Sequence, residues 1–179
     1  DASSGLMLVN AGIDVGSAPR ARESILEQIE VVRQGDFSDE EFEMTLGAWD
    51  QPSDTGWSGD YRDPVVRASG PFNSPSDVAI SPAGDLYISD GYGNARVHKF
   101  TSDGRLLSSW GEPGKTGHGQ FHVPHGVWVH TDDRVLVADR ENNRIQIFDA
   151  NGGFLDQWPN LARPCDIYID SDNVGYVPE

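Results

Sequence analysis

Few side chains in this sequence have the types and the spacing that catalysis or metal binding requires. Five histidines and one cysteine, Cys165, are present, and imidazole nitrogen and thiolate sulfur are both ligands of zinc. Two of the histidines, His122 and His125, lie three residues apart.

No Gly-x-Ser-x-Gly, P-loop or Cys-x-x-Cys pattern occurs, so a serine hydrolase, a nucleotide-binding protein and a zinc finger all lack a supporting motif. The acidic turns "HTDDR" and "DSDN" do not follow the twelve-residue pattern of a calcium-binding loop, and we interpret them as hairpin turns.

A tyrosine in a lengthened turn is the second feature that could do chemistry. The stretch "YISDGYGNARVHKF" (87–100) is repeated about 49 residues later as "LVADRENNRIQIF" (136–148), and the first copy has one extra residue beside Tyr92. Gly91 and Gly93 flank this tyrosine, and glycine permits backbone dihedral angles that other residues avoid. We therefore expect the turn to protrude from its strands.

The repeat that contains this turn continues to the end of the chain. "GPFNSP" (70–75) recurs as "GQFHVP" (119–124) and, more weakly, as "PNLARP" (159–164). Each is followed by short alternating segments and turns, which predict four short strands in each full unit. Four-stranded repeats of about 40–50 residues are typical of the blades of a β-propeller, which stack because one blade cannot bury both faces of its sheet. We predict a mainly β fold in which residues 70–179 form a partial β-propeller of two full four-stranded blades plus part of a third.

The geometry of a propeller predicts which side chains meet at its centre. The first strands of successive blades converge on the axis, so the residue that follows each repeated proline faces the central channel. In this chain those residues are Ser76, His125 and Cys165.

An aspartate and an arginine recur at the two ends of the turn in both full copies. The pairs are Asp90 with Arg96 and Asp139 with Arg144. We expect each pair to fix the turn between two strands through a charge-assisted hydrogen bond.

The remaining histidines have simpler interpretations. His98 is expected on the solvent face of a strand, His130 at the end of a strand, and His118 in a glycine-rich loop. For His122 two interpretations stay open. It lies on the surface of a loop, or it contacts His125 and supports the role of that residue.

The order of these motifs resembles a known family of repeat proteins. The pattern D-x-x-x-N-x-R-[IV]-x-x-F, together with F-x-x-P, is similar to the NHL repeat. Within that group, "SDGYGNARV", "WGEPG", "GQFHVPHGV" and "ADRENNRIQIF" resemble the peptidyl-α-hydroxyglycine α-amidating lyases, over residues 70–179. The resemblance implies a six-bladed propeller and a carbon–nitrogen lyase, which cleaves a peptide ending in α-hydroxyglycine into a peptide amide and glyoxylate.

The same resemblance assigns roles to residues of this chain. It implies zinc in the central channel, held by histidines from alternate blades, with His125 as the matched ligand; it also implies calcium as a further metal. Ser76 and Cys165 are then not zinc ligands, with Cys165 kept as a minor candidate. The matching tyrosine, Tyr92, is implied to take the proton of the substrate's hydroxyl group. Zinc lowers the pKa of a bound alcohol, and a phenolate kept charged by a nearby cation can act as a base.

One histidine cannot hold zinc, because zinc in proteins takes three or four protein ligands. The other zinc histidines of the family, and the arginine that pairs with the tyrosine, belong to blades that the resemblance does not find in this chain. Three explanations stay open: the chain is a fragment, copies associate to complete a ring, or the chemistry has been lost. A trimer of two-blade units would place three copies of His125 around one axis.

Residues 1–46 follow a different pattern. "GLMLVNAGID" predicts a buried strand, and "APRARESILEQIEVVRQG" predicts a helix with one apolar face. Ser38 and Glu41 match a capping box that begins a second, short helix. This small α/β appendage resembles a non-catalytic piece of an M16 (insulinase-like) peptidase, without the His-x-x-Glu-His zinc motif. Residues 47–69 have no periodicity and many turn-forming residues, so we predict a loop or linker.

Composition and charge narrow the function classes. The formal net charge is −16, and phosphate groups attract cationic surfaces, so nucleic acids and anionic membranes are excluded as partners. No apolar run is long enough to span a membrane. The first residues lack the basic start of a signal peptide, so we expect a soluble chain. A single cysteine cannot form an internal disulfide.

Three function classes stay open on this basis. The first is a zinc-dependent amidating lyase or a fragment of one, acting on a peptide substrate. The second is a non-catalytic NHL propeller that binds a protein or a peptide. The third is a non-catalytic M16-type fragment.

Overall fold

The structure, a computed structural model, describes residues 46 and 51–179. The chain divides into two compact units, Asp1–Glu43 and Met44–Glu179, and every described residue belongs to the second unit. No helix among these residues is long and apolar enough to cross a membrane.

The predictions for the N-terminal part concern residues that are mostly not described. The strand and helices predicted for residues 1–46, and the resemblance to an M16 peptidase, lie outside the described residues except for Leu46. Residues 51–76, which include most of the predicted linker, contain neither helix nor strand. Among the described residues the strands therefore begin at Asp77, directly after the first repeated motif "GPFNSP".

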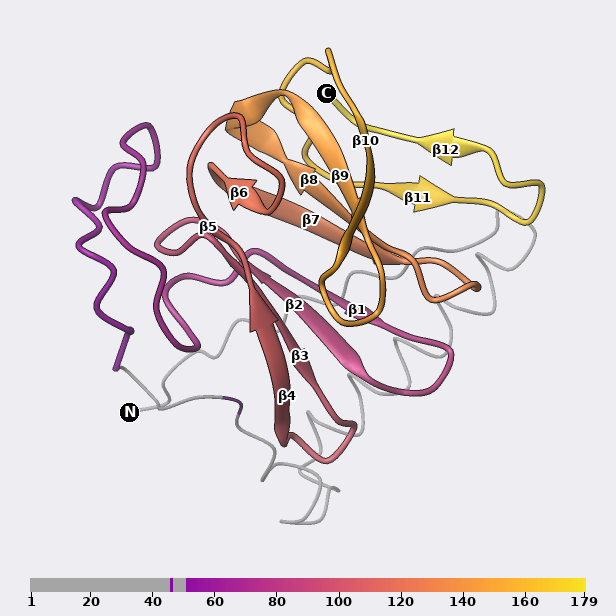
Figure 1. Ribbon diagram of the computed structural model, residues 1–179, viewed down its shortest axis with the longest axis horizontal. Helices are drawn as coiled ribbons and strands as arrows, with labels where there is room; N and C mark the ends of the chain where they lie inside the picture. The colour runs from indigo at the N-terminus through magenta and orange to yellow at the C-terminus, as the bar shows by residue number, and fades with distance from the viewer. Residues whose placement is uncertain (1–45, 47–50) are drawn as a thin grey trace, which may run out of the picture. The chain divides into compact units, whose positions relative to one another are not determined.

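The first repeat forms a four-stranded antiparallel sheet whose strands neighbour one another in chain order (Figure 1). Each strand is short and is separated from the next by a tight turn, as the alternating segments of the sequence predict. The strands are β1 (Asp77–Ile80), β2 (Leu86–Asp90), β3 (Arg96–Phe100) and β4 (Leu106–Trp110).

The second repeat forms a second sheet of the same design, and its first strand lies against the first two strands of the first sheet (Figure 1). A 3₁₀ turn, η1 (Arg140–Asn142), joins the two middle strands. The four strands are β7 (Pro124–Val129), β8 (Val135–Asp139), β9 (Arg144–Phe148) and β10 (Phe154–Trp158).

A third, two-stranded unit follows the second sheet. It is the antiparallel hairpin β11 (Tyr168–Ile169) and β12 (Gly175–Tyr176), and a short parallel pair, β5 (Glu112–Pro113) and β6 (Gln120–Phe121), lies between the two large sheets in the chain. Two four-stranded sheets and a hairpin confirm the predicted mainly β partial propeller of two full blades plus part of a third.

The first turn of each unit is built in the same way. In the first sheet the N–H of Ser81 donates to the carbonyl of Asp85 at 2.8 Å, and equivalent bonds close the turns at His130 and Asp170. The fourth residue of each turn has a positive φ, and it is glycine, aspartate or asparagine in turn: Gly84, Asp133 and Asn173. These residue types tolerate the left-handed region best, so the repeated turn is encoded locally.

The sheets stack face to face, and the second sheet is covered on both faces. One apolar cluster lies between the first and second sheets, with Tyr87 and Val97 packed against Val127 and Val137. A second cluster lies between the second sheet and the hairpin, where Ile167 and other residues meet the opposite face. Every residue of β8 and β9 is buried as a result.

The prediction that His98 lies on a solvent face is wrong. Its side chain is fully buried, its Nδ1 lies 2.7 Å from Ser109 Oγ, and Phe72 packs edge-on against its ring. Alternation along a strand predicts a solvent face only when one face of the sheet is open. Here Phe72, from the segment before β1, covers that face.

Candidate functional site

Tyr92 and His125, from different sheets, meet at one point. Tyr92 lies in the turn between β2 and β3, and His125 is the second residue of β7. The phenol oxygen of Tyr92 is 2.9 Å from Nε2 of His125, and the two rings meet edge to face with centroids 5.4 Å apart. Both side chains are half-buried, so the structure joins the two residues to which the resemblance assigns chemistry.

The glycines beside Tyr92 are needed for close packing. A Cβ atom at Gly91 would lie under 3.0 Å from the backbone carbonyl of Pro124, and one at Gly93 would meet the side chain of Asn73 equally closely. Neither glycine is among the residues with a positive φ, so the expected use of unusual dihedral angles is wrong. The turn instead lies directly against the start of β7, which brings Tyr92 to His125.

The hydrogen bonds of His125 fix which of its nitrogens carries the proton. Nδ1 lies 2.7 Å from the backbone carbonyl oxygen of Cys165, and a carbonyl oxygen can only accept. Nδ1 therefore carries the hydrogen, and in the neutral ring the lone pair is on Nε2. In that tautomer the lone pair accepts the hydrogen bond from the hydroxyl of Tyr92, so the basic atom of His125 faces a phenol.

The residues after the three repeated prolines lie side by side, as propeller geometry predicts. Ser76 donates through its hydroxyl to the carbonyl of Pro124 at 2.9 Å, and His125 reaches the carbonyl of Cys165 in the third unit. The thiol of Cys165 is directed at the carbonyl of Arg163, 3.5 Å away. The contribution of Cys165 to the site is therefore its backbone carbonyl rather than its sulfur.

His122 lines a small cavity beside the tyrosine. The cavity is open to solvent and is also lined by Asp63, Phe121 and Tyr92. Nε2 of His122 is buried and has no hydrogen-bond partner among the described residues. His122 therefore lies beside Tyr92, and its support of His125 stays a prediction.

Tyr61, which contacts Tyr92, and the charged side chains around Tyr61 were not assigned to the site from the sequence. Tyr61 packs edge-on against Tyr92 with ring centroids 6.4 Å apart, and the guanidinium of Arg140 lies 5.5 Å from the centre of the Tyr61 ring. Arg163 forms an ion pair with Glu141 at 2.6 Å. Arg140 and Glu141 belong to the motif "ADRENN", but no spacing in the sequence connects that motif with a tyrosine in the predicted linker.

Of the two predicted turn pairs, the one in the second sheet is present. Nε of Arg144 donates to the Asp139 carboxylate at 2.8 Å, and both side chains are buried. Arg144 also donates to the carbonyls of Gly117 and Gln120, at 3.0 and 2.8 Å. These two carbonyls hold the guanidinium against the carboxylate.

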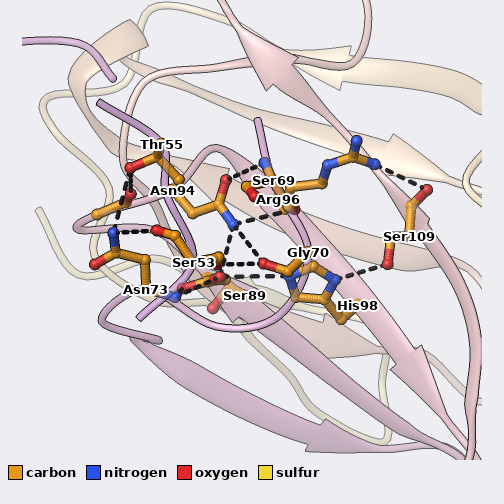
Figure 2. Close-up of polar contacts among 12 residues, drawn as sticks. Ser53, Thr55, Ser69, Gly70, Asn73, Ser89, Asn94, Arg96, His98 and Ser109 are labelled. Carbon is orange, nitrogen blue, oxygen red and sulfur yellow. Dashed lines mark hydrogen bonds and ion pairs between the residues drawn. The ribbon is translucent and has the colours of Figure 1, made fainter. Parts of the chain in front are cut away.

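The predicted pair of Asp90 with Arg96 is wrong. The Asp90 carboxylate accepts from Asn94 Nδ2 at 2.8 Å and lies 3.4 Å from His98 Nε2, while Arg96 donates to the carbonyl of Ser109 at 3.3 Å (Figure 2). The reason is tertiary, because β4 offers Arg96 a carbonyl acceptor that draws it away from the carboxylate.

A buried carboxylate links the first sheet to the second near His125. Oδ2 of Asp77 accepts from the N–H of Val127 at 2.9 Å. Burial raises the pKa of Asp77 above its ordinary value of 3.8, and the charge of Asp166 raises it further, against the opposing effect of the Val127 hydrogen bond.

Asp77→Asn is therefore expected to change how stability depends on pH. Because the folded state holds this proton more tightly than the unfolded state, its contribution is fully present below the unfolded pKa and is lost as pH rises through the raised folded pKa. Urea unfolding across this range should show the variant gaining stability relative to wild type as pH rises. A difference that stays constant with pH would contradict the prediction.

Asp149→Asn is the matched control of opposite sign. Hydrogen bonds from the N–H groups of Gly153 and Asn151 lower the pKa of Asp149. Its contribution is present above the unfolded pKa and is lost as pH falls, so this variant should lose stability relative to wild type as pH rises.

The described residues do not fit a complete zinc site. They contain no group of three or more His, Cys, Asp or Glu side chains arranged to share a metal ion, and zinc takes three or four protein ligands. His125 offers one imidazole nitrogen, and that nitrogen faces Tyr92. The same finding applies to calcium, which takes six to eight oxygen ligands.

Comparison with known proteins supports the repeat that was predicted from the sequence. Residues 72–100 and 121–148 match the NHL repeat family. NHL repeat-containing protein 3 of Homo sapiens is 42% identical over 110 residues, which cover 60% of this chain and 30% of that protein. The chain therefore carries NHL repeats, as predicted.

Other relatives have names that refer to peptide amidation. Peptidyl-glycine alpha-amidating monooxygenase B of Xenopus laevis is 40% identical over 46% of this chain, which spans 10% of that protein. Peptidyl-alpha-hydroxyglycine alpha-amidating lyase 1 of Drosophila melanogaster is 36% identical over 50% of this chain and 18% of its own length. The predicted resemblance to the lyase is confirmed, and the chain spans a small part of each relative.

Among solved structures, a hydrazine synthase from Kuenenia stuttgartiensis aligns with 58% of this chain and 28% of its own. The sequence identity is 19% and the TM-score is 0.49.

Proposed function

We propose that this chain is a relative of the zinc-dependent peptidyl-α-hydroxyglycine α-amidating lyases, or a part of one, and that it contributes a proton-transfer pair to that reaction. The observation that carries the proposal is the 2.9 Å contact between the Tyr92 hydroxyl and Nε2 of His125. Relatives named for this lyase, with 36% identity over half of the chain, support it.

The reaction splits the carbon–nitrogen bond of a peptide that ends in α-hydroxyglycine. The hydroxyl of the substrate loses its proton, its oxygen forms a carbonyl with the same carbon, and the electrons of the carbon–nitrogen bond leave with the nitrogen. The nitrogen takes up a proton, so the products are a peptide amide and glyoxylate. The protein must therefore accept one proton and return one.

The pair in this structure has the geometry for that exchange. Tyr92 can take the hydroxyl proton as it passes its own proton to Nε2 of His125, since a positioned acid or base must lie within about 2.6–3.2 Å of its partner. The Cys165 carbonyl accepts from Nδ1 and so stabilises the imidazolium that forms. The returned proton then goes to the departing nitrogen.

Zinc dependence is part of the proposal and requires ligands beyond the described residues of one copy. His125 would supply one imidazole nitrogen. A metal ion at Nε2 would take the place of the hydrogen bond from Tyr92, so the proton transfer to His125 applies to the ring without a metal, and we derive no step through the metal.

The experiment is to measure glyoxylate release from an N-acylated peptide that ends in α-hydroxyglycine, with and without added zinc. We expect release above the uncatalysed rate. A rate equal to that of buffer under both conditions, with the protein shown to be folded by circular dichroism, would reject the proposal.

Zinc titration is a second experiment. Wild type should bind zinc more tightly than His125→Ala does, and equally weak zinc binding by both proteins would count against the metal.

A second candidate is a non-catalytic NHL module that binds a peptide or a protein. The observation that favours it is the incomplete set of metal ligands among the described residues. Tight binding of the same peptide without any glyoxylate release would support this function over the first.

A further inference from the structure

We propose that three side chains of the first sheet are positioning residues, which hold His125 where it can exchange a proton with Tyr92. They are Ser76, Asp77 and Ser89, and we call them the clamp. The effect on rate rests on the proposed lyase function, whereas the contacts of the clamp do not depend on it.

The strand that carries His125 departs from regular pairing at this residue. The register of β7 on β8 shifts between Pro124 and Val127, so His125 and Gly126 lie together opposite one residue of β8, Ala138. A bulge of this kind disrupts the hydrogen-bond ladder and redirects a side chain. The pairing of β1 with β2 has no such shift, so of the two large sheets only the second has a bulge at this position.

The clamp binds the backbone on both sides of the bulge, through three hydrogen bonds that cross from the first sheet to β7. A buried backbone group that loses its ladder partner needs another one, because an unpaired buried polar group is costly. Each bond is 2.9 Å long: the Ser89 hydroxyl donates to the carbonyl of His125, the Ser76 hydroxyl donates to the carbonyl of Pro124, and the Asp77 carboxylate accepts from the N–H of Val127.

The two hydroxyl groups of the clamp are committed to β7. A hydroxyl has a single hydrogen to donate. The other acceptors near Ser76 and Ser89 are carbonyls of the first sheet at 3.2 and 3.4 Å, so for each serine the shortest acceptor lies on β7. Ser89 is fully buried, so bulk solvent does not reach its bond to His125.

The position of the His125 backbone matters because its ring has a partner on each side. Nε2 lies 2.9 Å from the hydroxyl of Tyr92, and Nδ1 lies 2.7 Å from the carbonyl of Cys165. A shift of the backbone toward either partner lengthens the contact with the other. On the side of the third unit, a Cβ atom at Gly126 would lie 2.7 Å from the Cα of Asp166, so the chain is already in close contact there. The clamp holds it from the side of the first sheet.

The same clamp also sets the position of Tyr92. Gly91 precedes this tyrosine, and a Cβ atom at Gly91 would lie less than 3.0 Å from both the carbonyl oxygen of Pro124 and the Oγ of Ser76. The turn therefore rests on the oxygen that Ser76 holds. One contact point fixes both members of the proton-transfer pair.

Two of the three clamp positions have changed in the second sheet. Counted from the repeated proline, Gly126 corresponds to Asp77, and Ala138 precedes its aspartate as Ser89 does. Side chains that served only to stack one sheet on the next would be expected in both sheets. The complete clamp instead occurs in the sheet that precedes the histidine.

The test is Ser89→Ala, made in the full chain and read in two ways. The first readout is the hydrogen exchange of the Nδ1 proton of His125, followed by NMR in protein labelled with ¹⁵N at histidine and assigned by its absence from His125→Ala. A buried hydrogen bond protects this proton, and we expect about tenfold faster exchange in Ser89→Ala, the effect of losing about one hydrogen bond. The second readout is glyoxylate release, for which we expect kcat to fall by about 10–10²-fold with KM unchanged, as for a misplaced catalytic group.

Ser81→Ala is the matched control. Ser81 is also a buried serine of the first sheet, at 6% exposure, and its hydroxyl accepts from the N–H of Asp85 at 3.1 Å. It lies at the opposite end of β2 from Tyr92, so both readouts should stay as in wild type. Ser76→Ala is a second clamp variant at a half-buried position, and it should change both readouts in the same direction as Ser89→Ala.

Three results would overturn the proposal. One is unchanged exchange of the His125 proton in both clamp variants, and another is an equal acceleration in Ser81→Ala. The third is faster exchange with unchanged kcat. The exchange readout needs no substrate, so a wild type that releases no glyoxylate would reject the lyase function and leave the test of the clamp in force.

Discussion

Tyr92→Phe is expected to lower the rate of glyoxylate release by about 10²–10⁴-fold, the range typical of a positioned acid or base. The substitution keeps the ring, and with it the edge-to-face contact with His125, but removes the oxygen that lies 2.9 Å from Nε2. The variant then has no hydroxyl group at this position to pass the proton of the substrate's hydroxyl to the histidine. The measurement is kcat for a peptide that ends in α-hydroxyglycine, compared with wild type.

Tyr87→Phe is the matched control for this effect. This substitution also removes a hydrogen-bonded hydroxyl, because the Tyr87 hydroxyl donates to the carbonyl of Ala150 at 3.1 Å. Tyr87, however, belongs to the apolar cluster between the sheets and not to the Tyr92–His125 pair. We expect kcat to stay close to that of wild type. A Tyr92→Phe protein with unchanged kcat would remove the tyrosine from the reaction.

Asp139→Ala is expected to lower the free energy of unfolding by about 3–5 kcal/mol, because breaking a buried ion pair leaves the partner charge uncompensated. The Asp139 carboxylate is fully buried and accepts from Arg144 at 2.8 Å. It also accepts from the N–H of His122 at 2.8 Å and from Asn142 Nδ2 at 2.9 Å. Urea unfolding of the variant and wild type measures the difference.

Two controls show whether the buried charge is the cause. Asp132→Ala breaks the ion pair between Asp132 and Arg134, and both side chains of this pair are about half exposed. This substitution should lower the free energy of unfolding by no more than about 1 kcal/mol. Adding Arg144→Met to Asp139→Ala should recover part of the loss, since it removes the uncompensated charge. Equal losses in Asp139→Ala and Asp132→Ala would contradict the argument.

The residues of the candidate site could be predicted from the sequence, but their contacts could not. The position of His125 after a repeated proline, and the extra residue beside Tyr92, mark both residues as unusual. Nothing in the spacing predicts that Cys165 would contribute its carbonyl oxygen instead of its sulfur. The acceptor that fixes the proton on Nδ1 of His125 is a backbone atom 40 residues away, and any residue type can supply a backbone carbonyl.

The two turn pairs show the same limit. The spacing of aspartate and arginine is similar in both sheets, yet only Arg144 reaches its aspartate. Arg144 has carbonyl partners at Gly117 and at Gln120 of β6, and Arg96 has one on β4. These acceptors come from other segments of the chain, so the local pattern does not identify them.

The sequence by itself determined the period of the repeat, the four short strands of each full unit and the turns between them. These features depend on the dihedral preferences and alternation of residues that are neighbours along the chain. Only the tertiary structure decided the burial of His98, the need for glycine at position 91 and the meeting of Tyr92 with His125, 33 residues apart. The physical reason is that each of these depends on atoms of another sheet or loop, and stacking places those atoms at distances that no local pattern records.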